Sequence, residues 1–204
     1  MFQLRQRVVT RPVLGVILLL AAALVWLAPL EQSLGAGIKV VYLHVALIWT
    51  GMTGLTLAGV FGLGVLISGK RTGQAWTQVI GWVAVAFFAG GIGMSMLAAQ
   101  INWGAIYWDE PRTVAMSRVL AVAVIVFVVT GWPLAERFKG LLSAGVAAFL
   151  AWSVFATPLV LHPENPIRTS PSLLIQFSFF GLFALTSLAA GWLVLYLHGH
   201  MRDA

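Results

Sequence analysis

The chain has 204 residues, of which 60% are hydrophobic and only 9% are charged. Soluble domains carry about a quarter charged residues, and a water-soluble fold of this size could not hide so much apolar surface. The composition therefore predicts a polytopic membrane protein. The net charge of +6 does not indicate nucleic-acid binding, because the basic residues lie in short loops that set membrane topology.

Segments of about 20 apolar residues are long enough to cross a bilayer as helices, and the sequence contains six of them. The predicted spans are 12–30, 40–68, 76–101, 114–134, 141–161 and 172–197. Pro12 suits the first turn of the first span. A cleavable signal peptide is the alternative for that segment, but its apolar run exceeds the usual core of about 7–15 residues. We expect an all-α integral membrane protein, with residues 1–204 forming one six-helix bundle.

The basic residues predict the orientation, because the side of the membrane richer in Lys and Arg is usually cytoplasmic. The richer side collects Arg5, Arg7, Arg11, Lys70, Arg71, Arg137, Lys139 and Arg202. The other side collects Lys39, Arg112, Arg118 and Arg168. Both termini are then cytoplasmic, and the loops 31–39, 102–113 and 162–171 face outward. Gly90, Gly91 and Gly93 predict close helix approach or a kink in the outer half of the third span.

The four histidines divide into two pairs. His198 and His200 are predicted in a solvated inner tail, with metal binding as a weak alternative. His44 and His162 lie near the outer face at similar depth on different helices, where an ionisable residue suggests a function. Either histidine alone could be hydrogen-bonded to a neighbouring helix. Together they favour metal ligation, and two imidazoles would hold a haem iron without covalent attachment.

The outer loop Asn102–Thr113 is the most polar and most aromatic loop of the chain. Trp103, Tyr107 and Trp108 offer flat apolar faces to a planar macrocycle, although aromatic residues also gather at any membrane interface. That belt does not account for the charged residues Asp109, Glu110 and Arg112. The arginines of this side, Arg112, Arg118 and Arg168, could pair with propionates, with lipid phosphate, or with Asp109 and Glu164.

Three segments resemble the cytochrome c assembly family of haem-handling membrane proteins, and in particular its short six-span CcmC branch. Val41–Trp49 resembles the first outer histidine segment of that family, and Thr157–Glu164 resembles the second. Asn102–Thr113 resembles its tryptophan-rich WWD motif. The copy here is one residue shorter between Trp-Gly and Trp-Asp, and Tyr107 takes an aromatic position.

The resemblance implies a haem-handling factor, not an enzyme, in the bacterial inner membrane. Haem b would be held transiently and non-covalently on the periplasmic side, with His44 and His162 as axial ligands. The other implied binding residues are Trp103, Gly104, Tyr107, Trp108, Asp109 and Arg112. Haem would pass to a periplasmic chaperone resembling CcmE. Further implied partners are a small CcmD-like subunit, transporter subunits resembling CcmA and CcmB, and membrane lipid.

The sequence is also compatible with two other functions. A haem b-containing electron-transfer subunit usually carries histidine pairs deep in its spans and across the bilayer, whereas both candidates here lie near one face. A small-molecule transporter without haem would use the aromatic loop only as an interfacial belt.

Overall fold

The computed structural model describes residues 2–157 and 170–203, with side chains described from 12 to 157 and from 170 to 200. Within these ranges the chain is all-α and forms six helices. They are α1 (Phe2–Leu27), α2 (Ile38–Ser68), α3 (Arg71–Trp103), α4 (Pro111–Val129), α5 (Glu136–Ala156) and α6 (Leu173–Asp203).

Five of the described helices, α2 to α6, are long and apolar enough to cross a membrane. The prediction of a multi-pass membrane protein is therefore confirmed. The apolar part of α1, Pro12–Leu27, is shorter than the other five. The prediction that Pro12 opens this helix is wrong, because α1 begins at Phe2 and contains Pro12 in its interior. The sequence prediction followed the apolar run, whereas the backbone continues as a helix through the basic residues that precede it.

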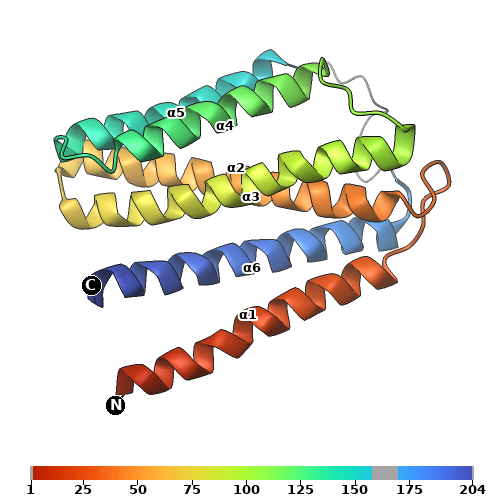
Figure 1. Cartoon of the computed structure of the whole chain (residues 1–204), viewed down its shortest axis with the longest axis horizontal. Coiled ribbons are helices and arrows are strands. Elements are labelled where there is room, and N and C mark those ends of the chain that lie inside the picture. Colours follow the sequence, from red (N-terminus) through yellow and green to blue (C-terminus); the bar gives the residue numbers. More distant parts are fainter. Residues whose placement is uncertain (1, 158–169, 204) are drawn as a thin grey trace.

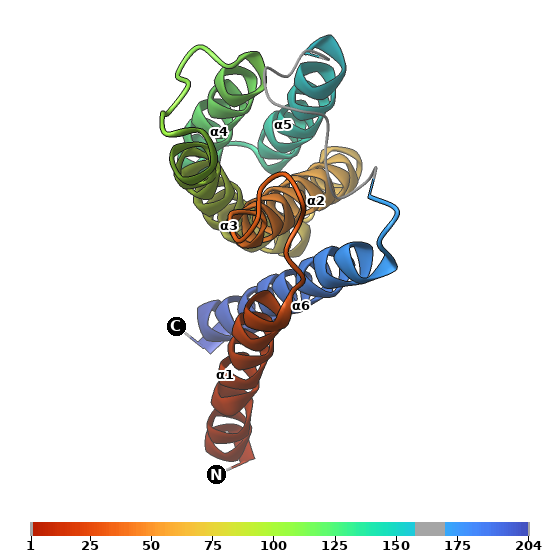
Figure 2. The ribbon, with the colours of Figure 1, turned by 90° about the vertical axis from the view of Figure 1, so that its right-hand side faces the viewer.

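The helices run side by side along the long axis, and successive helices reverse direction (Figure 1). The start of α1, the end of α6 and the turns α2–α3 and α4–α5 lie at one end, called here the inner end. The connections α1–α2 and α3–α4 lie at the other, called the outer end. Figure 2 shows α2 to α5 gathered together, with α6 beside them and α1 at the periphery. Helix α1 packs mainly on α6.

Two apolar clusters hold the bundle together. The larger joins α2 to α5 around Leu55, Phe88 and Phe127, and the smaller joins α1, α2 and α6 around Tyr42 and Phe179. Lipid is as apolar as these side chains, so helices in a bilayer associate largely through close packing of small residues.

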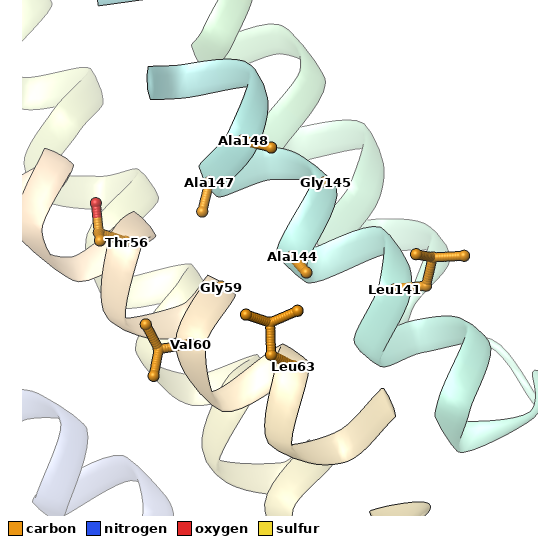
Figure 3. A pocket seen from close by; sticks show the side chains of 9 residues that line it. All are labelled: Thr56, Gly59, Val60, Leu63, Leu141, Ala144, Gly145, Ala147 and Ala148. Atoms are coloured by element: carbon orange, nitrogen blue, oxygen red, sulfur yellow. The ribbon is translucent and has the colours of Figure 1, made fainter. Parts of the chain in front are cut away.

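Helices α2 and α5 illustrate this close packing. A Cβ atom at Gly140 would lie 2.5 Å from the carbonyl oxygen of Gly62, so the two backbones approach more closely than any larger residue at 140 would allow. Beside this crossing, α2 and α5 form an apolar groove of about 420 Å³ (Figure 3). It is lined largely by small side chains, including Gly59, Ala144 and Ala148.

The predicted boundaries of α4 and α5 differ from the observed ones. Helix α4 ends at Val129, five residues before the predicted end at Leu134. Gly131 and Pro133 follow, and both disfavour continuation of a helix. Helix α5 begins at Glu136, so the segment Glu136–Lys139, predicted as a loop, is its first turn. The predicted end of this span at residue 161 lies outside the described residues.

The prediction of a solvated inner tail is also wrong. Helix α6 continues to Asp203 and includes both His198 and His200. His198 is only 9% exposed, and its ring stacks on the indole of Trp76, with ring centroids 3.7 Å apart. The Nδ1–H of His200 donates a hydrogen bond to the carbonyl of Tyr196 over 2.8 Å. Packing on α3 and hydrogen bonding within α6 therefore keep this polar end helical.

Candidate functional site

The aromatic loop begins where α3 ends in a left-handed glycine. Gly104 has φ +76°, and its N–H donates to the carbonyl of Gln100 over 3.0 Å. The side-chain amide of Gln100 donates in return to the carbonyl of Gly104 over 3.1 Å. Glycine adopts this conformation without the steric cost that a Cβ brings. The predicted outer loop is thus the last turn of α3, the connection 104–110 and the first turn of α4.

The aromatic side chains of this loop are exposed. Tyr107 is 51% exposed, Trp108 is 64% exposed and Trp103 is 38% exposed. Asp109, next to Trp108, is exposed as well. The loop therefore offers flat apolar surface beside a carboxylate at the outer end. An interfacial aromatic belt and a ligand-binding platform both require this exposure, so exposure alone does not distinguish the two.

Glu110 caps the start of α4. One of its carboxylate oxygens accepts a hydrogen bond from the backbone N–H of Thr113 over 2.5 Å, and Pro111 occupies the first helical turn. Glu110 is only 6% exposed, and its other oxygen, Oε1, is buried without a hydrogen-bond partner. A buried polar atom of this kind is uncommon in native proteins. Glu110 therefore fixes the end of the loop and retains one unused acceptor.

Arg112 connects the start of α4 to the end of α5. Its Nη2 donates to the carbonyl of Thr157 over 2.9 Å, and its Nε is buried without a hydrogen-bond partner. Among the described residues, neither Asp109 nor Glu110 forms an ion pair with Arg112. The predicted pairing of Arg112 with an anionic ligand is not tested by these contacts. They show that one N–H of its guanidinium is still without an acceptor.

His44 lies on α2 and is partly buried. Its Nδ1 is 2.9 Å from the carbonyl oxygen of Gly91 on α3. A carbonyl only accepts hydrogen bonds, so Nδ1 carries the proton and the lone pair of the neutral ring lies on Nε2. Gly91 permits this contact, because a Cβ at position 91 would lie 2.7 Å from the backbone nitrogen of Ile48 on α2. The predicted close helix approach is confirmed at Gly91, whereas a Cβ at Gly90 or Gly93 would meet nothing within 4 Å.

The loop lies over the end of α2 that carries His44. The amide of Asn102 donates to the carbonyls of Ala98, over 2.9 Å, and Gly37, over 3.4 Å. These contacts join the last turn of α3 to the start of α2. His44 is six residues beyond Ile38, which a rise of about 1.5 Å per residue converts to roughly 9 Å. The histidine therefore lies within the bundle, about two turns below the level at which the loop begins.

Several predicted residues are not tested by the structure. His162, Glu164 and Arg168 lie outside the described residues, so the pairing of His44 with His162 remains a prediction. Arg118 is exposed on α4. Within residues 2–157 and 170–203, no three or more His, Asp or Glu side chains gather as a metal-binding group.

Sequence reasoning missed three groups that position this site. They are the carbonyl of Gly91, the carboxylate of Glu110 and the carbonyl of Thr157. Proline is common in the first turn of a helix, so Pro111 could have placed the start of α4 correctly. Nothing local in the sequence identifies the two carbonyls, because each contact depends on the relative position of two helices.

These observations define a multi-pass α-helical membrane protein with a partly buried histidine below an exposed aromatic loop. No protein-family model matches the chain, and no curated protein matches it.

Proposed function

We propose that the chain is a haem-handling protein of cytochrome c maturation, similar to the CcmC type. It holds haem b transiently and non-covalently at the outer end, with His44 and His162 as axial ligands. It then passes the haem to a periplasmic haem chaperone resembling CcmE. In this proposal the protein is not an enzyme.

The hydrogen bond between the His44 ring and the carbonyl of Gly91 is the observation that carries this proposal. Histidines that bind metals commonly donate their other ring N–H to a carbonyl or a carboxylate, which fixes the ring orientation. The hydrogen bond from His44 Nδ1 to Gly91 has this form and leaves the lone pair on Nε2. Histidine is a usual ligand of haem iron, and in the neutral ring Nε2 would donate its lone pair to the iron.

The loop supplies surfaces that suit the rest of a planar, dianionic ligand. Trp103, Tyr107 and Trp108 are exposed, and aromatic rings favour contact with an extended π-system. Arg112 has a buried Nε–H without an acceptor, and guanidinium groups bind carboxylates with high geometric specificity. In this proposal the aromatic residues hold the flat ring, and Arg112 pairs with a propionate.

We place the protein in the bacterial inner membrane, and the distribution of charge supports an orientation with both termini in the cytoplasm. Lys70 and the first helical turns that contain Arg71 and Arg137 lie at the inner end, where α1 also begins and α6 ends (Figure 1). The excess of basic residues at this end is typical of the cytoplasmic side. The outer end is then periplasmic and accessible to the chaperone. The proposed membrane partners are the CcmD-like subunit and the CcmA-like and CcmB-like transporter subunits.

Haem content of purified variants tests the proposal. We expect His44→Ala and His162→Ala each to lose most of the bound haem. The matched control is His200→Ala, which removes a histidine from the inner end and should retain haem. Substituting both Trp103 and Trp108 with Ala should also weaken haem retention. Unchanged haem content in both axial-ligand variants would exclude His44 and His162 as the haem ligands. Absence of haem from the natural chain as well would favour a transporter without haem.

A further inference from the structure

A second cavity lies at the inner end, opposite the aromatic loop, and unlike the apolar groove between α2 and α5 it is polar. Helices α3 and α5 begin there and α4 ends there. The cavity has a volume of about 210 Å³. Its polar lining consists of Arg71, Gln74, Gln78, Thr130, Glu136 and Lys139. This cavity is called here the inner pocket, and no part of the proposed haem site uses it.

Two of the lining side chains, Gln78 and Thr130, are hydrogen-bonded to each other and to the backbone. Gln78 donates to the carbonyl of Phe127 over 2.6 Å, and the hydroxyl of Thr130 donates to the amide oxygen of Gln78 over 2.8 Å. These hydrogen bonds join α3 to the end of α4, so Gln78 and Thr130 have a structural role on that side of the pocket.

Gln74 is different. It is only 6% exposed, and neither its amide nitrogen nor its amide oxygen has a hydrogen-bond partner. Oε2 of Glu136 is also buried without a partner. Buried polar groups in native proteins nearly always have partners. The inner pocket therefore contains one unused amide donor group and two unused acceptor oxygens.

The charges around the pocket favour an anion. Lys139 is 9% exposed, and its Nζ lies 3.3 Å from Oε1 of Glu136. Nε of Arg71 lies 3.9 Å from the same oxygen. One carboxylate thus faces two cations, which leaves a net charge of +1. The first turns of α3 and α5 add the partial positive charge of two helix N-termini.

We propose that the inner pocket binds a phosphate group carrying a glycerol hydroxyl, with a net charge of −1 or −2. The phosphate oxygens accept from Lys139, Arg71 and the amide nitrogen of Gln74. The hydroxyl donates to the amide oxygen of Gln74 or to Glu136. Phosphatidylglycerol in the adjacent leaflet and soluble glycerol phosphate share this chemistry. Basic pockets between membrane helices on the cytoplasmic side are known to bind anionic headgroups.

Native mass spectrometry of the full chain tests this proposal. Protein from nanodiscs containing equal amounts of phosphatidylglycerol and phosphatidylcholine should retain phosphatidylglycerol selectively. If soluble glycerol 3-phosphate binds in detergent instead, the shared chemistry holds and the source of the ligand is soluble. Binding of neither probe above the phosphatidylcholine background would overturn the proposal.

Four variants test the residues involved. Gln74→Leu removes both unused amide atoms, and Gln74→Glu places a like charge against the phosphate. Each should weaken binding about tenfold or more, as expected for loss of a hydrogen bond to a charged group. Arg71→Gln should also weaken binding. Its matched control is Arg137→Gln, at the same end but outside the pocket lining, which should bind as the natural chain does. Natural binding by a folded Gln74→Glu protein would refute the assignment.

Discussion

Replacing Gly91 with alanine would drive a methyl group into the backbone of α2. The added Cβ would lie 2.7 Å from the nitrogen of Ile48 and 2.8 Å from its Cγ1. Contacts below 3.0 Å against a backbone atom require one helix to move. The same movement would displace the carbonyl of Gly91, to which His44 donates its ring N–H. A single methyl group therefore tests both the helix contact and the orientation of the histidine.

The energetic cost of the methyl group added at Gly91 can be isolated by comparison with neighbouring glycines. An added Cβ at Gly90 or Gly93 would meet nothing within 4 Å. All three substitutions gain the same helix propensity, up to about 1 kcal/mol. The difference between them is therefore the overpacking term alone, which is about 1–3 kcal/mol. At about 2–4 °C per kcal/mol for a chain of this size, Gly91→Ala should melt several degrees below the other two variants.

Thermal unfolding in one detergent, followed by circular dichroism, measures this order. We expect Gly90→Ala and Gly93→Ala to melt at or above the natural chain and Gly91→Ala to melt below it. Equal melting temperatures for all three variants would refute the close approach of α2 and α3 at this position. The hydrogen bond between His44 and Gly91 would then lose its structural basis.

Two further predictions concern stability. Glu110→Ala removes the cap of α4 and should lower the free energy of unfolding by about 1 kcal/mol. Asp109→Ala, in the exposed loop, should leave the stability unchanged. Equal melting temperatures of the two variants would contradict the capping role. Thr50→Val removes the buried hydrogen bond between the hydroxyls of Thr50 and Thr186, whose oxygens lie 2.8 Å apart. This change should lower the free energy of unfolding by roughly 0.6 kcal/mol. Thr56→Val is its control, since that hydroxyl bonds only to its own helix, and a larger effect at the control would reject the prediction.

The sequence predicted the central helices well because bilayer length and apolar composition constrain them directly. It was less informative at the helix ends. Helices α1 and α6 continue through polar residues, where hydropathy gives no signal. His198 shows the reason in α6: its ring is buried against Trp76 on α3, a contact that only the packed bundle reveals.

The candidate site was predictable as a set of residue types at one membrane face. The exposure of Trp108 follows from its place in a loop, and the sequence indicated that place. The hydrogen bond of His44 could not be predicted, because it depends on the register of α2 against α3 at Gly91. The inner pocket was also missed, since Lys139 was predicted in a loop and Gln74 precedes the predicted span 76–101, where nothing in the sequence indicated that it is buried in a helix.

The absorbance spectrum of the purified protein tests the central claim most directly. We predict a low-spin, six-coordinate haem in the natural chain and in His200→Ala, and loss of that signal in His44→Ala. Added imidazole should restore the six-coordinate spectrum of His44→Ala, because the free base can occupy the space of the missing ring. Absence of haem from the natural chain, or an unchanged spectrum in His44→Ala, would contradict the proposed function.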